Sequence, residues 1–221
     1  MKKVLILAEG QTEETFIKHI LAPHLLPLNV SPVPIIIATK RIKSGSHFRG
    51  GVPSYEKVKK EILRLLRDSS AALVTLMIDY YGLPKSFPGR AAVEGATPLE
   101  RVRFVEDALQ ADINHPRFVP YYSLHEFEAL LFASTSVIAQ VFARPDLEQR
   151  LAAIRAAFPT PEDIDDDPIT APSARLESLY PQYSKPFFGS RIAARIGIQA
   201  MREECKHFDD WLRQLEVLGS V

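Results

Sequence analysis

The sequence has little cysteine and no long apolar run, and both absences exclude classes of protein. Cys205 is the one cysteine among 221 residues, so an internal disulfide and the cysteine pairs of a structural zinc site are excluded. No segment approaches the roughly 20 consecutive apolar residues of a membrane span. The apolar run after the N-terminal lysines stops at Glu9, too early for a signal peptide. We therefore expect a cytoplasmic protein without a membrane partner.

An excess of either charge is also missing. Lysine plus arginine and aspartate plus glutamate both number 27, so a nucleic acid would have to be bound by a local basic patch. The sequence contains no Walker-type glycine-lysine loop and no GxGxxG dinucleotide motif. Binding of ATP or NAD in those two modes therefore lacks support.

What is present is an alternation of apolar runs with amphipathic segments. The apolar runs predict strands at residues 4–8, 33–38, 72–80 and 118–123, and the patterns after them predict helices at 12–26, 54–68, 98–113 and 129–132. This order predicts an α/β fold, in which helices flank a parallel sheet. From Ser134 onward the pattern changes to helices and proline-rich loops. We expect an α/β core at residues 1–133 and a helical extension at 134–221 packed on it.

Four acidic residues follow predicted strands. Glu9 follows the first strand, Asp79 ends the third, and Glu126 and Glu128 follow the fourth. Ligands of parallel sheets bind beyond the carboxyl ends of the strands, so these side chains are expected to converge. Convergent carboxylates repel one another unless a cation neutralises them, and Mg²⁺ or Mn²⁺ prefers oxygen ligands. The pattern predicts metal-assisted phosphoryl transfer.

Each acidic residue alone also has a structural interpretation. Glu9 and Gly10 can simply turn the chain, Asp79 can cap a loop, and Glu13 with Glu14 can complement a helix dipole. These separate structural roles do not explain why several acidic residues all lie at or just after the ends of predicted strands. We keep Glu13 as a further catalytic candidate.

Two basic segments are candidates for binding phosphate. Arg49, Gly50 and Gly51 lie in a loop after the second predicted strand, and the alternative is a solvated glycine turn. Lys185 and Arg191 flank a Phe-Phe-Gly-Ser segment, and the alternative is an ordinary pair of surface charges.

Five segments carry a resemblance to a known family. They are residues 8–14 (AEGQTEE), 78–84 (IDYYGLP), 124–132 (LHEFEALLF), 187–193 (FFGSRIA) and 205–212 (CKHFDDWL). With these, the chain resembles a bacterial Toprim-like family, a domain of unknown function related to the nuclease domain of overcoming-lysogenization-defect (OLD) proteins. The resemblance implies a Toprim-like, Rossmann-like fold.

The resemblance also implies roles for individual residues. In Toprim domains a glutamate after the first strand acts in acid/base chemistry, and an Asp-x-Asp after the third binds Mg²⁺. Glu9 and Asp79 match, whereas Tyr81 stands in place of the second aspartate, and tyrosine is a poor ligand for Mg²⁺. Glu126 or Glu128 is expected to replace the missing carboxylate.

The functional expectation is a Mg²⁺- or Mn²⁺-dependent nuclease acting on DNA more readily than on RNA. The resemblance implies a role in antiphage defence or mobile elements, beside an ATPase partner. Two alternatives stay open: a catalytically degenerate binding or regulatory subunit of such an ATPase, and a site for a small ligand. The catalytic candidates are Glu9, Glu13, Asp79, Glu126, Glu128 and Lys185. Glu9, Asp79 and Glu128 are the expected metal ligands, and Arg49, Gly50, Gly51 and Arg191 the expected phosphate-binding residues.

Overall fold

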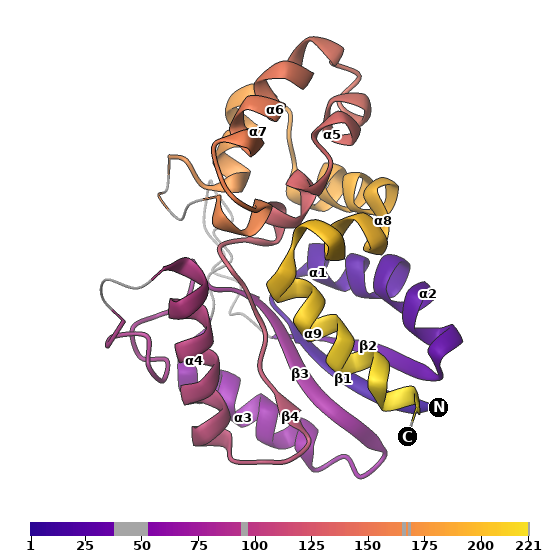
Figure 1. Cartoon of the computed structure of the whole chain (residues 1–221). Coiled ribbons are helices and arrows are strands. Elements are labelled where there is room, and N and C mark those ends of the chain that lie inside the picture. Colours follow the sequence, from indigo (N-terminus) through magenta and orange to yellow (C-terminus); the bar gives the residue numbers. More distant parts are fainter. Residues whose placement is uncertain (38–52, 94–96, 165–166, 168, 221) are drawn as a thin grey trace, which may run out of the picture.

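The computed structural model describes residues 1–37, 53–93, 97–164, 167 and 169–220 (Figure 1). Its described strands form one parallel sheet in the order β2-β1-β3-β4, and β5 pairs with the end of β3. The strands are β1 (Lys2–Ala8), β2 (Val30–Ile36), β3 (Ala71–Asp79), β4 (Phe118–Val119) and β5 (Tyr122–Ser123). The α/β prediction with a parallel sheet is thereby confirmed.

Helices follow the strands, and in the described part of the chain after β5 every element is helical. The α-helices are α1 (Gln11–Phe16), α2 (Ala22–Leu25), α3 (Tyr55–Leu66), α4 (Pro98–Ile113), α5 (Thr135–Val141), α6 (Glu148–Ala156), α7 (Pro172–Leu179), α8 (Ser190–Glu204) and α9 (Lys206–Glu216). The π-helices are η1 (Ile17–Leu21) and η6 (Lys185–Gly189), and the 3₁₀ helices are η2 (Leu26–Leu28), η3 (Phe127–Ala133), η4 (Pro145–Leu147), η5 (Pro161–Asp163) and η7 (Val217–Ser220). A helical C-terminal part was predicted and is confirmed.

The start of β2 corrects a prediction, because the strand begins at Val30 rather than at residue 33 and contains two prolines. The backbone carbonyl of Asn29 accepts a hydrogen bond from Lys2, and the backbone N–H of Ile37 donates one to Ala8. Odd-numbered residues of β2 therefore bond to β1, and Pro32 and Pro34 face the other side of the strand. Proline is tolerated there because no N–H is needed on that side.

The predicted fourth strand is divided in the structure. β4 and β5 each contain two residues, separated by Pro120 and Tyr121. Pro120 lacks the N–H that a continuous ladder requires. Beyond the break, the backbone N–H of Tyr122 donates a hydrogen bond to the Glu106 side chain of α4 at 2.8 Å.

Both faces of the sheet are buried. Alternate residues of β1 belong to two apolar clusters, one with α3 and α4 and the other with α1, α8 and α9 (Figure 1). Ile192 of α8 and Trp211 of α9 lie in the same cluster as Ile6 of β1. The indole N–H of Trp211 donates a hydrogen bond to the Thr75 hydroxyl at 3.0 Å, which ties α9 to β3. Residues on both sides of position 133 thus share one core, and the domain boundary there stays a prediction.

Among the described residues, no helix has both the length and the apolar composition needed to cross a bilayer.

Candidate active site

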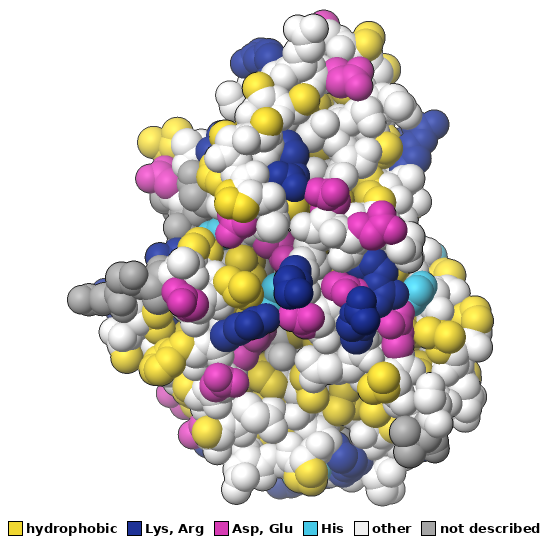
Figure 2. Space-filling model, in the orientation of Figure 1, with side chains coloured by type: hydrophobic (Ala, Val, Ile, Leu, Met, Phe, Trp, Pro, Cys, Tyr) yellow, Lys and Arg dark blue, Asp and Glu magenta, His cyan; other side chains and the backbone are white. Residues whose placement is uncertain are grey.

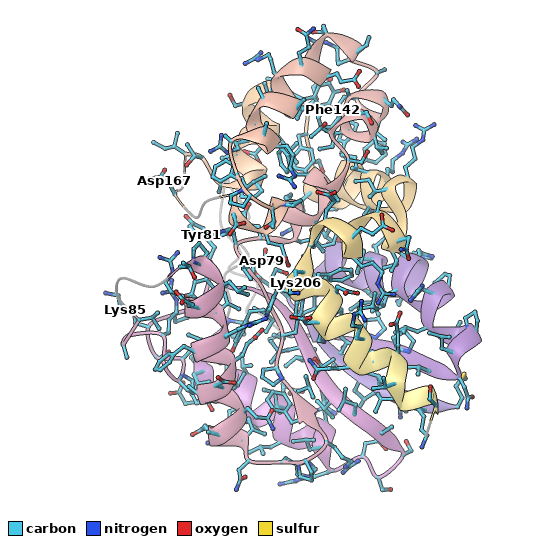
Figure 3. The ribbon with its side chains drawn as sticks, in the orientation of Figure 1. Asp79, Tyr81, Lys85, Phe142, Asp167 and Lys206 are labelled. Atoms are coloured by element: carbon cyan, nitrogen blue, oxygen red, sulfur yellow. The ribbon has the colours of Figure 1, made fainter. Side chains whose placement is uncertain are left out.

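Carboxylates gather at the carboxyl ends of β1 and β3. Glu9 directly follows β1, and Asp79 is the last residue of β3. The two strands are parallel neighbours, with Ala8 opposite Met77, so both residues lie at one edge of the sheet. Figure 3 shows Asp79 where the sheet meets the helical upper part of the molecule. Ligands of parallel sheets bind beyond the carboxyl ends of the strands, and Glu9 and Asp79 lie at that edge.

Lys185 lies among these carboxylates. Its ammonium nitrogen is 2.9 Å from Asp79 Oδ2, 3.1 Å from Glu128 Oε2 and 3.5 Å from Glu13 Oε1. The charge of Lys185 also acts on Glu9. We call Glu9, Glu13, Asp79 and Glu128 the carboxylate cluster. Lys185 begins η6, so the helical C-terminal part supplies the positive charge at this site.

Three of the four carboxylates are fixed by a helix turn or by a hydrogen bond. Glu13 lies in the first turn of α1, which begins at Gln11, shortly after the end of β1. Asp79 Oδ1 accepts a hydrogen bond from the backbone N–H of Phe127 at 2.9 Å, which links β3 to η3. The fully buried Glu128 accepts one from the Tyr183 hydroxyl at 3.1 Å. The cluster is thus built from three separate segments of the chain.

Gly189 permits the contact between Glu128 and Tyr183. A Cβ atom at this position would lie 3.2 Å from the Tyr183 hydroxyl oxygen, tighter than most such contacts. Any larger residue would press against the group that orients Glu128. The glycine between Phe188 and Ser190 therefore serves the site by its small size.

Burial makes the carboxylates harder to ionise. It raises the pKa of Glu9 to about 8, with the neighbouring Asp79 charge adding to the effect. Burial likewise raises the pKa of Glu128 to about 7, although Lys185 counteracts part of the shift. The pKa of Glu13 is raised by burial too. Protonated and ionised forms of this cluster are therefore both accessible near neutral pH.

Lys185 remains charged in spite of its surroundings. Desolvation alone would lower its pKa, but the attraction of Asp79, Glu128 and Glu13 outweighs that effect and raises the pKa well above the usual value. One ammonium faces four carboxyl groups, so the cluster carries excess negative charge whenever more than one of them is ionised.

The donor set fits a hard divalent cation. Four carboxyl groups offer oxygen ligands, and the buried Glu9 Oε2 has no hydrogen-bond partner within the described protein. Within the described ranges, however, no three acidic, histidine or cysteine side chains are already arranged as a metal centre. The Lys185 ammonium stands between three of the carboxylates instead. A cation bound by Glu9, Asp79 and Glu128 would displace this ammonium.

Other predicted residues lie elsewhere or beyond what the structure describes. The Glu126 carboxylate accepts hydrogen bonds from the backbone N–H and the hydroxyl of Ser173, both at 2.9 Å, at the start of α7. Arg191 is exposed, with its guanidinium 5.0 Å from the Phe187 ring centroid. Arg49, Gly50 and Gly51 lie outside the described residues.

Tyr183 is a residue of the site that the sequence did not indicate. Its hydroxyl contacts Glu128 across 55 positions of sequence, and no motif marks that contact. Lys185, a catalytic candidate that could also supply positive charge to a phosphate, pairs with carboxylates in this structure. Tyr183 lies two residues before Lys185, but this spacing points to the site only when the fold is already known.

Comparisons with known proteins give one family and one structure. The fold is similar to that of the C-terminal region of the Burkholderia pseudomallei OLD protein, with a TM-score of 0.45 and 15% identity over 98% of this chain and 99% of that chain. No curated protein sequence matches the chain significantly. The model of the family described as "Domain of unknown function (DUF4276)" matches residues 8–216. Since this match spans nearly the whole sequence, the chain belongs to the DUF4276 family.

Proposed function

We propose that the protein is a Toprim-like nuclease that hydrolyses phosphodiesters with Mg²⁺ or Mn²⁺, in a bacterial defence or mobile-element system. One observation carries the proposal: Glu9, Asp79 and Glu128 lie together with Lys185 at the carboxyl edge of the sheet. The likeness of the Glu9 and Asp79 segments to Toprim motifs supports the same conclusion. DNA is the proposed substrate in preference to RNA.

Each residue has a chemical role in this proposal. Glu9, Asp79 and Glu128 would hold the cation, which when bound polarises a phosphoryl oxygen and acidifies a bound water. In the metal-free protein burial raises the pKa of Glu9 to about 8, so Glu9 could accept and donate a proton near neutral pH in a state in which it does not bind the cation. Tyr183 keeps the Glu128 carboxylate oriented through its hydroxyl. Lys185, once displaced from the carboxylates, would stabilise negative charge on phosphate.

A second candidate function is a catalytically degenerate subunit that regulates a partner ATPase. The observation in its favour is the ion pairing of Lys185, which neutralises part of the carboxylate cluster from within the chain. Tyr81, in place of a second acidic residue, agrees with this candidate. The two functions differ in whether the isolated chain cleaves nucleic acid.

The test is cleavage of labelled single-stranded and double-stranded DNA by the purified chain in Mn²⁺, Mg²⁺ or EDTA. Cleavage is expected with either cation and should fall about 100-fold or more in Glu9→Gln and Asp79→Asn, because the first removes a positioned acid/base and the second a charged ligand of the cation. Glu126→Gln is the matched control, since this glutamate bonds Ser173 instead. No cleavage by the wild type would favour the regulatory subunit, and equal cleavage by Asp79→Asn would exclude this site as the source.

A further inference from the structure

Two exposed aromatic side chains lie close in sequence to members of the site. Phe187 is 54% exposed and Tyr81 is 38% exposed. Tyr81 follows Asp79 by two residues, and Phe187 follows Lys185 by two residues. The side chains of Asp79 and Lys185 are only 2.9 Å apart, so the two aromatic residues lie on segments that meet at the carboxylate cluster. Figure 3 shows Tyr81 beside Asp79.

Phe187 is supported from beneath although it is exposed. Its ring meets Phe188 edge-to-face, with centroids 4.9 Å apart and planes at 85°. Phe188 in turn packs against Tyr180 and Phe142, at 5.3 Å and 5.6 Å between centroids. A large apolar side chain is thus held at the surface by an ordered aromatic layer rather than buried in it.

Arg191 lies one helical turn further along and contacts the same ring. Its guanidinium carbon is 5.0 Å from the Phe187 centroid, within the range of a cation–π interaction. Both side chains are exposed, so an aromatic ring and a planar cation are offered to solvent together. These are the two kinds of surface on which nucleic-acid bases stack, and the cation can also pair with phosphate.

Because the molecule has no net charge, binding of a nucleic acid would depend on stacking with its bases as well as on charge. Positive and negative side chains number 27 each, and on the face shown in Figure 2 they are intermingled rather than gathered by sign. A general electrostatic attraction for the backbone of a duplex is therefore weak. Base faces within a duplex are already stacked on each other, whereas unpaired bases are free to meet an exposed ring.

We propose that Phe187 and Arg191 form a stacking platform for unpaired bases, with the exposed Tyr81 two residues after Asp79 as a second ring, so that the preferred substrate is single-stranded DNA. The platform rests on the proposed function, since it places an unpaired strand beside the carboxylates that would cleave it. Phe187 is its central residue and Arg191 supports it.

Equilibrium binding of a fluorescein-labelled oligothymidylate and of a matched duplex, in EDTA to prevent cleavage, tests the platform. Phe187→Leu keeps apolar bulk without an aromatic face and should weaken single-strand binding roughly tenfold. Arg191→Lys keeps the charge but loses the planar group, and should weaken binding less while leaving the salt dependence unchanged. Phe104→Leu is the matched control, because Phe104 is 49% exposed on α4 and should bind as the wild type does. Equal affinity of Phe187→Leu and wild type, or tighter binding of the duplex, would overturn the proposal.

The binding assay separates this proposal from the nuclease proposal. Binding that depends on Phe187, in a wild-type chain that cleaves nothing in Mn²⁺, would support the platform and reject the hydrolysis. Cleavage that depends on Asp79, with no effect of Phe187→Leu on binding, would reject the platform alone. Circular dichroism melting of each variant checks that the exposed substitutions leave the fold intact.

Discussion

At the residue scale, the unusual feature is the number of buried carboxyl groups that face one lysine. Glu9, Glu13 and Glu128 all have raised pKa values, and burial is the largest cause for each. When the pKa of a carboxyl group is higher in the folded state than in the unfolded state, protonation of that group stabilises the folded state. The metal-free protein must therefore either protonate some of these groups or bear their repulsion.

The first prediction is that stability of the metal-free protein falls with rising pH. The pKa of Glu9 is about 8 in the folded protein and 4.5 in a free side chain, so its contribution is fully present below about pH 4.5 and lost as pH rises through 8. The slope is at most about 1.4 kcal/mol per pH unit for each such group. Chemical denaturation in EDTA at pH 5, 6, 7 and 8 measures it. Glu9→Gln should show a shallower decline, and two parallel curves would contradict the assignment.

A second prediction separates Glu128 from Glu126. Mn²⁺ should raise the thermal unfolding midpoint of the wild type, because a cation that binds only the folded state stabilises it. Glu128→Gln should lose this rise, and Tyr81→Phe should keep it. Glu126→Gln should also keep it, but should be destabilised by about 1 kcal/mol because a neutral amide with a single acceptor oxygen replaces the carboxylate that accepts both hydrogen bonds from Ser173. A full Mn²⁺ response in Glu128→Gln would remove that residue from the ligand set.

Single residues of the site differ in how far the sequence could predict them. Glu9 and Asp79 were predictable because each ends a clear apolar run, and parallel strands bring such ends together. Glu128 was the expected ligand of the pair, but the contact of Glu126 with Ser173 was not predictable, since the direction of each side chain depends on how the chain enters η3. Tyr183 and the ion pairs of Lys185 depend on contacts more than 50 positions apart, which no local pattern contains.

At the scale of elements, short irregular segments decide where the site residues lie. The predicted helix at 12–26 is an α-helix interrupted by the π-helix η1, and η6 is a second π-helix that begins with Lys185. Strand positions were predicted better than their ends, because Pro32 and Pro120 act through backbone hydrogen bonds that depend on the neighbouring strand. Apolar periodicity alone does not contain that information.

The third prediction concerns the kink in α8. Gly197 has φ 77° and ψ 162°, a conformation that is strained for any other residue. Apart from the adjacent residues and the backbone of the helix itself, no atom lies within 4 Å of a Cβ at this position, so the main cost of substitution is the backbone conformation. Gly197→Ala should therefore reduce the free energy of unfolding by about 1–3 kcal/mol, as measured by denaturant titration. Stabilisation, which an alanine gives in a regular helix, would show that the kink is absent in solution.

At the scale of the whole molecule, the C-terminal helical part completes both the core and the site. Phe208 and Trp211 of α9 share an apolar cluster with Val4 and Ile6 of β1, while η6 supplies Lys185. The sequence correctly predicted helices after residue 134. The sequence also predicted Lys185 as a site residue of this part, but not its ion pairs or the Tyr183 contact, which arise from packing against the sheet.

The fourth prediction follows from this shared core. A fragment of residues 1–133 would expose one apolar face of the sheet, so it should not fold cooperatively. Thermal unfolding followed by circular dichroism, with the full chain as the control, measures this. A cooperative transition in the fragment would show that the C-terminal part is a dispensable addition.

The proposed nuclease activity requires a divalent cation at the carboxylate cluster, which calorimetric titration of Mn²⁺ tests most directly. The wild type should bind Mn²⁺, and Asp79→Asn should bind it at least about tenfold more weakly because a charged oxygen ligand is lost. Lys185→Met should bind it more tightly than the wild type, since the ammonium no longer competes for Asp79 and Glu128. Equal affinity of Asp79→Asn and wild type, or loss of binding in Lys185→Met, would contradict the proposed cation site.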